Sequence, residues 1–259
     1  MSANLVARET GWRMRDWTHG ERTTEEAFRP LETFADRFGA LLAHVRGLGF
    51  DTLDVWTAHL HWRWATDEHL AIARELLDRH GLRVATVAGG FGKTEEDLGR
   101  ACGVAVAVGA PVLGGMLDAR AGEPEVAAVL RGHGLRLGLE NHPEDRTVED
   151  MLARIGDGAG GTVGTTVDTG WWATHGVDAG RAIEALAPHV VHVHLKDVRA
   201  AGAHDTCPWG EGVVPVERCV AALRRIGYAG AISVEHEPPD GDPSEACRAM
   251  RETLAGWLS

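Results

Sequence analysis

Four short segments, far apart in the chain, each end a hydrophobic run with side chains that can do chemistry. They are RLGLENH (136–142), GTTVDTG (164–170), VVHVHLKD (190–197) and AISVEHE (231–237). If each segment is a β-strand, successive side chains point to opposite faces. The aliphatic residues then share one face, and the other face carries the polar ones. These are Glu140, His142, Asp168, His192, His194, Lys196 and Glu235.

Three carboxylates and an imidazole in one cavity would repel and desolvate one another unless a positive charge lay among them. A divalent cation would supply that charge. Oxygen-rich ligation with one nitrogen suits Mn²⁺ first, with Mg²⁺, Co²⁺ or Zn²⁺ as alternatives, and leaves coordination positions open for a substrate. Such an ion can stabilise negative charge that develops on a bound substrate, and a carboxylate beside it can act as an acid or a base.

Strand-like runs alternate with amphipathic, helix-like runs along the whole chain. The expected strands are Asn4–Ala7, Thr52–Trp56, Arg83–Val87, Pro111–Gly115, Arg136–Glu140, Thr162–Asp168, Val190–Leu195 and Ala231–Glu235. The helical patterns between them, such as 31–49, 67–81 and 214–227, have apolar residues every three or four positions and end at glycine. Alternation of this kind predicts parallel strands joined by right-handed crossovers.

About eight such units in roughly 250 residues is the size of a (β/α)8 barrel. We therefore expect the α/β class and a single domain over residues 1–259. An open doubly wound sheet is the alternative, but no G-x-G-x-x-G follows Asn4–Ala7. In a barrel the inward-facing residues at the carboxyl ends of the strands meet at one mouth. The four polar segments would then face one another.

Composition excludes several kinds of partner. The formal net charge is -12, which disfavours nucleic acid. No apolar run reaches the roughly 20 residues that a membrane span requires, and the first residues lack a secretory pattern, so we expect a cytoplasmic protein. The four cysteines show no paired spacing and are expected to be reduced thiols that pack in the core. A homo-oligomer is left open.

The motifs GLENH, VDTG, VHVHLKD, the GEG of PWGEGVV, and SVEHE together resemble those of the xylose isomerase-like TIM barrels, the sugar phosphate isomerase/epimerase superfamily. The resemblance covers essentially the whole chain. It implies a metal held by Glu140, Asp168, His194 and Glu235. By similarity to the epimerases, Glu140 and Glu235 would also be the catalytic acid/base pair.

Further residues are candidates for substrate contact, each with a structural alternative. They are His142, Lys196, Trp171, His175, His59, His61 and Trp12. His142 could instead orient Glu140, and Lys196 could form an ion pair with Asp197. Many superfamily members carry a histidine three residues after the metal-binding aspartate, whereas this chain has Trp171.

The resemblance implies an enzyme of carbohydrate metabolism that isomerises or epimerises a sugar or cyclitol. One alternative keeps the metal and bases but ends in elimination, as in an inosose dehydratase or a lyase that acts on an oxidised glycoside. A barrel that binds sugar without catalysis is the third possibility. All three predict a small-molecule ligand and neither nucleic acid nor membrane as partner.

Overall fold

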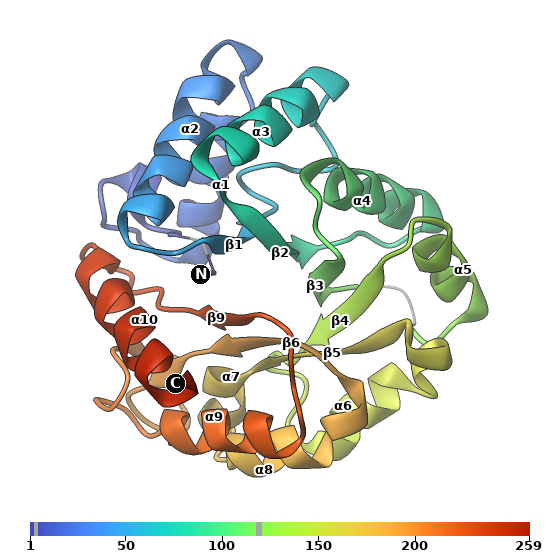
Figure 1. Cartoon of the computed structure of the whole chain (residues 1–259), viewed down its shortest axis with the longest axis vertical. Helices are drawn as coiled ribbons and strands as arrows, with labels where there is room; N and C mark the ends of the chain where they lie inside the picture. Colours follow the sequence, from blue (N-terminus) through green and yellow to red (C-terminus); the bar gives the residue numbers. More distant parts are fainter. Residues whose placement is uncertain (3–4, 118–120) are drawn as a thin grey trace.

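The computed structural model describes residues 1–2, 5–117 and 121–259. Within these residues seven parallel strands form one curved sheet in the order β1-β2-β3-β4-β5-β6-β9, with helices around its outside (Figure 1). The strands are β1 (Thr52–Trp56), β2 (Arg83–Gly90), β3 (Val112–Met116), β4 (Arg136–Glu140), β5 (Val163–Asp168), β6 (Val190–Leu195) and β9 (Ile232–Val234). A short antiparallel pair, β7 (Asp197–Val198) and β8 (Thr206–Cys207), follows β6. The predicted TIM barrel is confirmed.

Helices lie between the strands, as the apolar spacing predicts. They are α1 (Trp17–Phe28), α2 (Leu31–Gly47), α3 (Asp67–His80), α4 (Glu95–Val108), α5 (Pro124–Gly132), α6 (Val148–Ile155), α7 (Thr169–Thr174), α8 (Ala179–Ala185), α9 (Val216–Arg225) and α10 (Ser244–Leu258), with 3-10 turns η1 (Arg8–Thr10), η2 (Gly158–Gly161) and η3 (Ala187–His189). Thr66, Thr94 and Thr147 begin α3, α4 and α6, because each hydroxyl accepts a hydrogen bond from the backbone N–H three residues on.

The predicted first strand, Asn4–Ala7, is wrong in its described part. Asn4 itself lies outside the described residues, and Leu5–Ala7 form a turn that leads into η1. The gap between β9 and β1 is bridged instead by Met1 and Ser2: Ser2 N donates to Val234 O at 3.0 Å, and Met1 O accepts from Asp54 N at 2.9 Å. Backbone hydrogen bonds thus nearly close the barrel.

Side chains fill the barrel interior below the mouth. Thr166 Oγ1 donates to Gly138 O at 3.0 Å. A Cβ added at Gly138 would lie only 2.5 Å from the Thr166 hydroxyl oxygen. Glycine is needed there because any side chain would collide with the threonine. A packed interior leaves the carboxyl ends of the strands as the place for a ligand.

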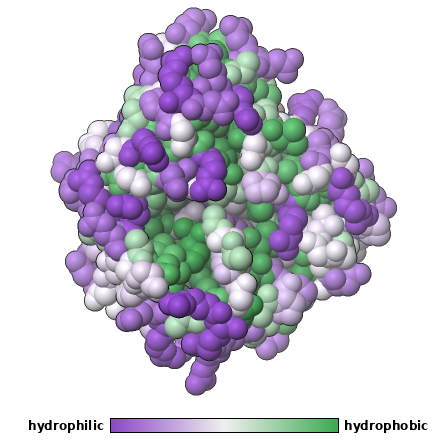
Figure 2. All heavy atoms as spheres, in the orientation of Figure 1, coloured by the Kyte–Doolittle hydropathy of each residue, from purple (hydrophilic) through white to green (hydrophobic). Residues whose placement is uncertain are grey.

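A larger cavity, of about 780 Å³, lies at the other end of the barrel, where β1, β2 and β9 begin. Its charged residues include Arg74 with Asp78 and Arg83 with Asp51, which pair at 3.2 Å and 3.6 Å. None of the described residues that line it belongs to a group of side chains placed to hold a metal ion. Figure 2 shows apolar residues toward the middle of the molecule and hydrophilic residues toward its rim.

None of the helices in the described part of the chain is both long and apolar enough to span a membrane. The cysteines Cys102, Cys207, Cys219 and Cys247 are buried and free, as predicted.

Candidate active site

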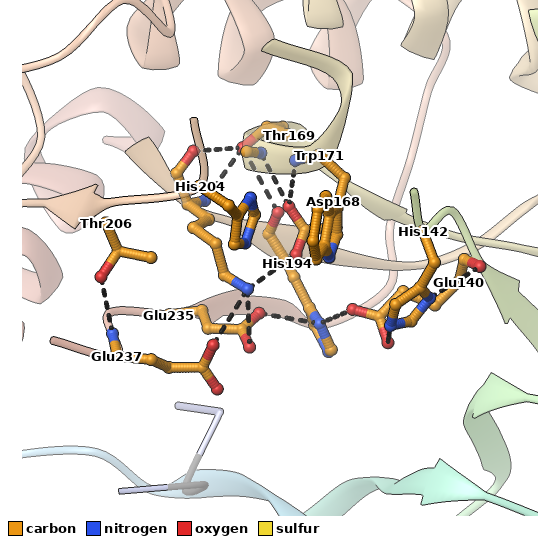
Figure 3. Close-up of polar contacts among 12 residues, drawn as sticks. Glu140, His142, Asp168, Thr169, Trp171, His194, His204, Thr206, Glu235 and Glu237 are labelled. Atoms are coloured by element: carbon orange, nitrogen blue, oxygen red, sulfur yellow. Dashed lines mark hydrogen bonds and ion pairs between the residues drawn. The ribbon is translucent and has the colours of Figure 1, made fainter. Parts of the chain in front are cut away.

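Four strands bring two glutamates, an aspartate and a histidine to one point. Glu140 ends β4, Asp168 ends β5, His194 lies in β6, and Glu235 directly follows β9. One ligand atom from each lies within 4.8 Å of the others, and all four residues are buried. His194 Nδ1 is 2.9 Å from Glu140 Oε1 and 2.9 Å from Glu235 Oε2, with the carboxylates on opposite sides of the ring (Figure 3).

Two cationic groups compensate the charge of these carboxylates. Burial by itself would lower the pKa of His194, but Glu235 and Glu140 outweigh it and raise the pKa well above its usual value. Lys196 Nζ lies 2.9 Å from Asp168 Oδ2, 3.3 Å from Glu235 Oε1 and 3.1 Å from Glu237 Oε2. The carboxylates raise the pKa of Lys196 against the opposing effect of burial. The site is therefore built to hold positive charge among its carboxylates.

The donor set suits a divalent cation. Three carboxylates and one imidazole nitrogen within a small radius match the oxygen-rich ligation of Mn²⁺, Mg²⁺ or Co²⁺. In the metal-free protein the positive charge between Glu140 and Glu235 is that of the protonated His194 ring. A cation bound at this point would take the place of that proton.

Hydrogen bonds fix the orientation of Asp168. Its Oδ1 accepts from Gly170 N at 2.7 Å and Trp171 N at 3.0 Å, which caps α7 and leaves Oδ2 toward Lys196. Asn141 pairs with the Asp168 backbone: its Nδ2 donates to Asp168 O at 2.9 Å, and its Oδ1 accepts from Asp168 N at 2.8 Å. The asparagine of GLENH thus holds the ends of β4 and β5 together.

Lys196 does not pair with Asp197, the alternative that the sequence left open. Asp197 instead accepts N–H groups from Gly210 at 3.0 Å, Gly212 at 3.1 Å and Val214 at 2.9 Å. This explains the GEG motif structurally, because the aspartate holds that loop against β6. The lysine is free to turn toward the carboxylate cluster.

A cavity of about 350 Å³ opens over the cluster. Its lining residues are Trp17, Glu21, Trp56, Ala88, Gly89, Gly90, Met116, Glu140, His142, Pro143, Trp171, His194, Lys196, His204, Glu235 and Glu237. Three of the residues predicted to contact substrate are among them: His142, Trp171 and Lys196. His142 Nε2 also lies 3.9 Å from Glu140 Oε2, so both readings of His142 remain compatible with its position.

The other four predicted substrate contacts, His59, His61, Trp12 and His175, are not among the residues that line this cavity. His59 is buried between Phe28 and Trp56, with ring centroids 4.6 Å and 5.5 Å away. His61 Nδ1 accepts from Arg63 N at 3.0 Å. Trp12 follows η1, where its carbonyl accepts from Gly241 N at 2.8 Å, and His175 forms the end of α7.

His59 provides a test of this placement through stability. Burial, followed by the nearby charge of Arg8, lowers its pKa to about 3, so the folded protein holds the ring neutral while the unfolded chain protonates it below about 6.5. Stability from this group is present above pH 6.5 and falls as the pH drops toward 3, by up to about 2 kcal/mol at pH 5. When the pH is lowered from 7 to 5, we expect the free energy of unfolding to fall less in His59→Phe than in the wild-type protein. Urea unfolding at both pH values measures this, and an unchanged pH dependence would contradict it.

Glu21, which reaches the cavity from α1, and His204, from the loop between β7 and β8, were not predicted. Trp17 also lines the cavity from α1; the sequence left it open as a sugar contact or a structural ring. The His204 ring stacks on Trp171 with centroids 3.5 Å apart and planes at 10° (Figure 3). The Nδ1 of His204 lies 2.9 Å from Thr174 Oγ1. No spacing in the sequence links these residues to the cluster, because loop and helix packing bring them there.

Asp54 also lies at the cluster, and strand alternation in β1 could have found it. Its Oδ1 is 3.3 Å from His192 Nε2, and its Oδ2 is 3.6 Å from His194 Nε2. Burial opposes ionisation of Asp54, but the two histidines hold its pKa well below the usual range. His194 therefore has a carboxylate near each ring nitrogen. His192 lies between Asp54 and Ser233, whose Oγ is 3.3 Å from His192 Nε2.

Among curated proteins, the chain is 34% identical over 83 residues to an L-ribulose-5-phosphate 3-epimerase of Shigella flexneri serotype 5b (strain 8401). That match covers 30% of this chain and 29% of the epimerase. A 58-residue match to the same enzyme of an Escherichia coli strain is 40% identical and covers 22% of this chain and 20% of that protein. The chain thus spans less than a third of these relatives in the matched regions.

Solved structures match over more of the chain. A xylose isomerase-like TIM barrel protein from Mycobacterium smegmatis, in complex with magnesium, has a TM-score of 0.71 at 20% identity and covers 86% of this chain and 89% of its own. A xylose isomerase domain protein from Alicyclobacillus acidocaldarius has a TM-score of 0.67 at 24% identity, with coverage of 85% and 92%. These likenesses support the fold. The sequence profile of the family matches residues 42–253, and the chain therefore belongs to the xylose isomerase-like TIM barrel family.

Proposed function

We propose that the chain is a divalent-metal-dependent isomerase or epimerase that acts on a small sugar or cyclitol. The observation that carries this proposal is the pair of glutamates on opposite sides of His194, at the base of the cavity. The partial matches to sugar-phosphate epimerases support the same class, as does the fold shared with an E. coli 3-keto-D-glucoside 4-epimerase (TM-score 0.64) and a D-psicose 3-epimerase (TM-score 0.67).

Glu140, Asp168, His194 and Glu235 would hold the metal. A bound divalent cation supplies positive charge beside the substrate carbonyl, which makes the neighbouring C–H bond more acidic. Mn²⁺ remains the first choice for this donor set, with Mg²⁺, Co²⁺ or Zn²⁺ as alternatives.

Proton transfer would fall to the two glutamates. We infer that they also flank the bound substrate, so that one would take the proton from carbon and the other would return a proton to the opposite face, which inverts that centre. If one glutamate acts alone, the same chemistry gives a 1,2-shift or elimination. Lys196 contacts both Asp168 and Glu235 and would hold these carboxylates in position.

Solvent exchange tests the proposed function. Purified protein loaded with Mn²⁺ is incubated in D₂O with ketoses, inososes and 3-oxo-glycosides, and the products are analysed by NMR and mass spectrometry. We expect an isomer that carries deuterium at the reacting carbon. Release of water or of two products would indicate the lyase alternative, and binding without exchange at any carbon would indicate a non-catalytic barrel.

Asp54 would hold the His194 ring so that Nδ1 faces the metal position. Histidine ligands commonly donate their second N–H to a carboxylate, and loss of such a partner lowers metal affinity by roughly 10–100-fold. We expect Asp54→Asn to weaken Mn²⁺ binding by about that factor and to change the visible spectrum of the Co²⁺-loaded protein. Calorimetry and absorption spectroscopy measure both effects.

The control for Asp54 is Asp51→Asn, the same change at the exposed residue just before β1. It should leave Mn²⁺ affinity at the wild-type value. Wild-type affinity and an unchanged Co²⁺ spectrum in Asp54→Asn would show that Asp54 has no influence on the ligand.

A further inference from the structure

We propose that the cavity takes an uncharged polyol, a free sugar or cyclitol, and rejects phosphate esters. This inference rests on the proposed function and names its substrate class. That class differs from the substrate of the curated relatives, which are named as epimerases of a sugar phosphate. Charge, backbone donors and the shape of the lining each support it.

The charge around the cavity is negative. Six carboxylates line it or lie at the cluster at its base: Glu21, Asp54, Glu140, Asp168, Glu235 and Glu237. Lys196 and a divalent ion would together supply three positive charges, so the carboxylates remain in excess. Like charges brought together in a poorly solvated site cost several kcal/mol, and a phosphate dianion would meet that repulsion.

The one described lysine that lines the cavity is not available to a phosphate. Among the lining residues that the structure describes, Lys196 is the one lysine and arginine is absent. The Lys196 ammonium contacts three carboxylates, at 2.9, 3.3 and 3.1 Å. Burial lowers the pKa of His204 to about 4, so its imidazole adds no charge near pH 7. A phosphate would have to break the lysine contacts to gain a counter-charge.

Backbone donors that commonly bind phosphate are already used. Phosphate sites in barrels form at helix N-termini and in the loops that follow the last strands. Here Gly170 N and Trp171 N, at the start of α7, donate to Asp168 Oδ1. Gly210 N and Gly212 N, in the loop after β6, donate to Asp197 Oδ2. Each glycine segment thus has an acidic side chain of this chain where a phosphate oxygen would lie.

The remaining lining suits the C–H face of a small ring. Trp17 and Trp56 meet edge to face, with centroids 5.7 Å apart, and Trp171 stands on another part of the lining. Aromatic faces pack against apolar surface, while the polar groups lie at the base of the cavity. Gly90 leaves room beside them, because a Cβ at that position would meet nothing within 4 Å.

Matched pairs of ligands test the substrate class. Mn²⁺-loaded protein is assayed in D₂O with D-fructose, D-tagatose and L-ribulose, and in parallel with D-fructose 6-phosphate, D-tagatose 6-phosphate and L-ribulose 5-phosphate. Scyllo-inosose is included as a free cyclitol. We expect exchange with at least one free compound and a kcat/KM at least about 100-fold lower for the phosphate ester of an accepted sugar.

The outcomes separate this inference from the proposed function. If phosphate esters exchange as well as the free sugars or better, the substrate class is wrong and the isomerase proposal survives. If no compound exchanges, the proposed function is itself overturned. Should only the inosose exchange, while all three esters remain inert, the uncharged class is supported.

A charge-reversal pair tests the cause of the rejection. Glu21→Lys places a cation on the lining, whereas Glu26→Lys makes the same net change at an exposed residue of the same helix. We expect Glu21→Lys to raise kcat/KM for the ester relative to the free sugar by at least about 10-fold, and Glu26→Lys to leave that ratio unchanged. Equal effects of the two variants would show that local charge does not exclude the ester.

Discussion

Replacement of Glu235 by glutamine is expected to lower kcat by about 10²–10⁴-fold while the protein still binds Mn²⁺. Glutamine has the shape of glutamate and keeps an oxygen for the metal, but it cannot accept a proton at neutral pH. Turnover should therefore fall further than metal affinity. Deuterium exchange measures the first quantity and calorimetric Mn²⁺ titration the second. The same result is expected for Glu140→Gln, because its carboxylate lies at the same 2.9 Å from His194 Nδ1.

Glu211→Gln is the matched control. Glu211 is exposed and lies 3.9 Å from Arg199, so the same chemical change there should leave kcat at the wild-type value. Comparison with His194→Ala completes the test, since loss of the imidazole should weaken Mn²⁺ binding more than either glutamine variant does. Full activity in Glu235→Gln or Glu140→Gln would remove that glutamate from the proposed acid/base pair.

Mn²⁺ should stabilise the folded protein strongly. At a free concentration 100 times the dissociation constant, the free energy of unfolding rises by about 2.7 kcal/mol. For a chain of this size that corresponds to an increase in Tm of roughly 5–10 °C. The physical reason is the burial of Glu140, Asp168 and Glu235 around one point, where an ion relieves their mutual repulsion. Thermal unfolding with and without Mn²⁺, and after chelation, measures the shift.

The effect of Mn²⁺ should depend on pH with a defined sign. The carboxylates raise the pKa of His194 in the metal-free protein, so its protonated form stabilises the fold at low pH and this contribution is lost as the pH rises through that pKa. Mn²⁺ must displace the proton from the ring. Metal affinity should therefore increase with pH, and binding should release protons, which calorimetry in buffers of different ionisation enthalpy detects.

His194→Ala should abolish most of the Mn²⁺-dependent rise in Tm. His133→Ala is the control, because His133 is exposed and lies outside the cluster. Its ring nitrogen Nδ1 lies 2.9 Å from the backbone oxygen of Val129. It should retain the full shift. An equal rise in Tm in both variants would place the stabilising ion elsewhere.

Most of the barrel could be predicted from local pattern. Three of the expected strands, Thr52–Trp56, Arg136–Glu140 and Val190–Leu195, have the predicted bounds, and four more differ by one to three residues at their ends. Hydrophobic period and glycine stops are local properties, so they can be read without knowing the fold. The same local pattern wrongly predicted a strand at Asn4–Ala7. Its apolar residues Leu5 and Val6 are buried, but in a turn.

The cluster was predictable because strand alternation is equally local. An inward residue at the end of each of four parallel strands must point to the same mouth once the barrel closes, and the structure brings Glu140, Asp168, His194 and Glu235 together. Glu21, Trp17 and His204 could not be found in this way. They reach the cavity through the packing of α1 and of the loop after β7, for which the sequence has no period.

The sequence alone predicts the parallel barrel, its polar mouth and the four side chains gathered there. Each of these features depends on the alternation of side chains within a strand. The partners of individual side chains required the folded chain. Lys196 faces Asp168 and Glu235 while Asp197 faces backbone N–H groups, although the two residues are adjacent. His142 lines the cavity and His59 does not, although both follow strands. Contacts of this kind join residues tens to hundreds of positions apart, so they arise from the way loops and helices pack and no local pattern records them.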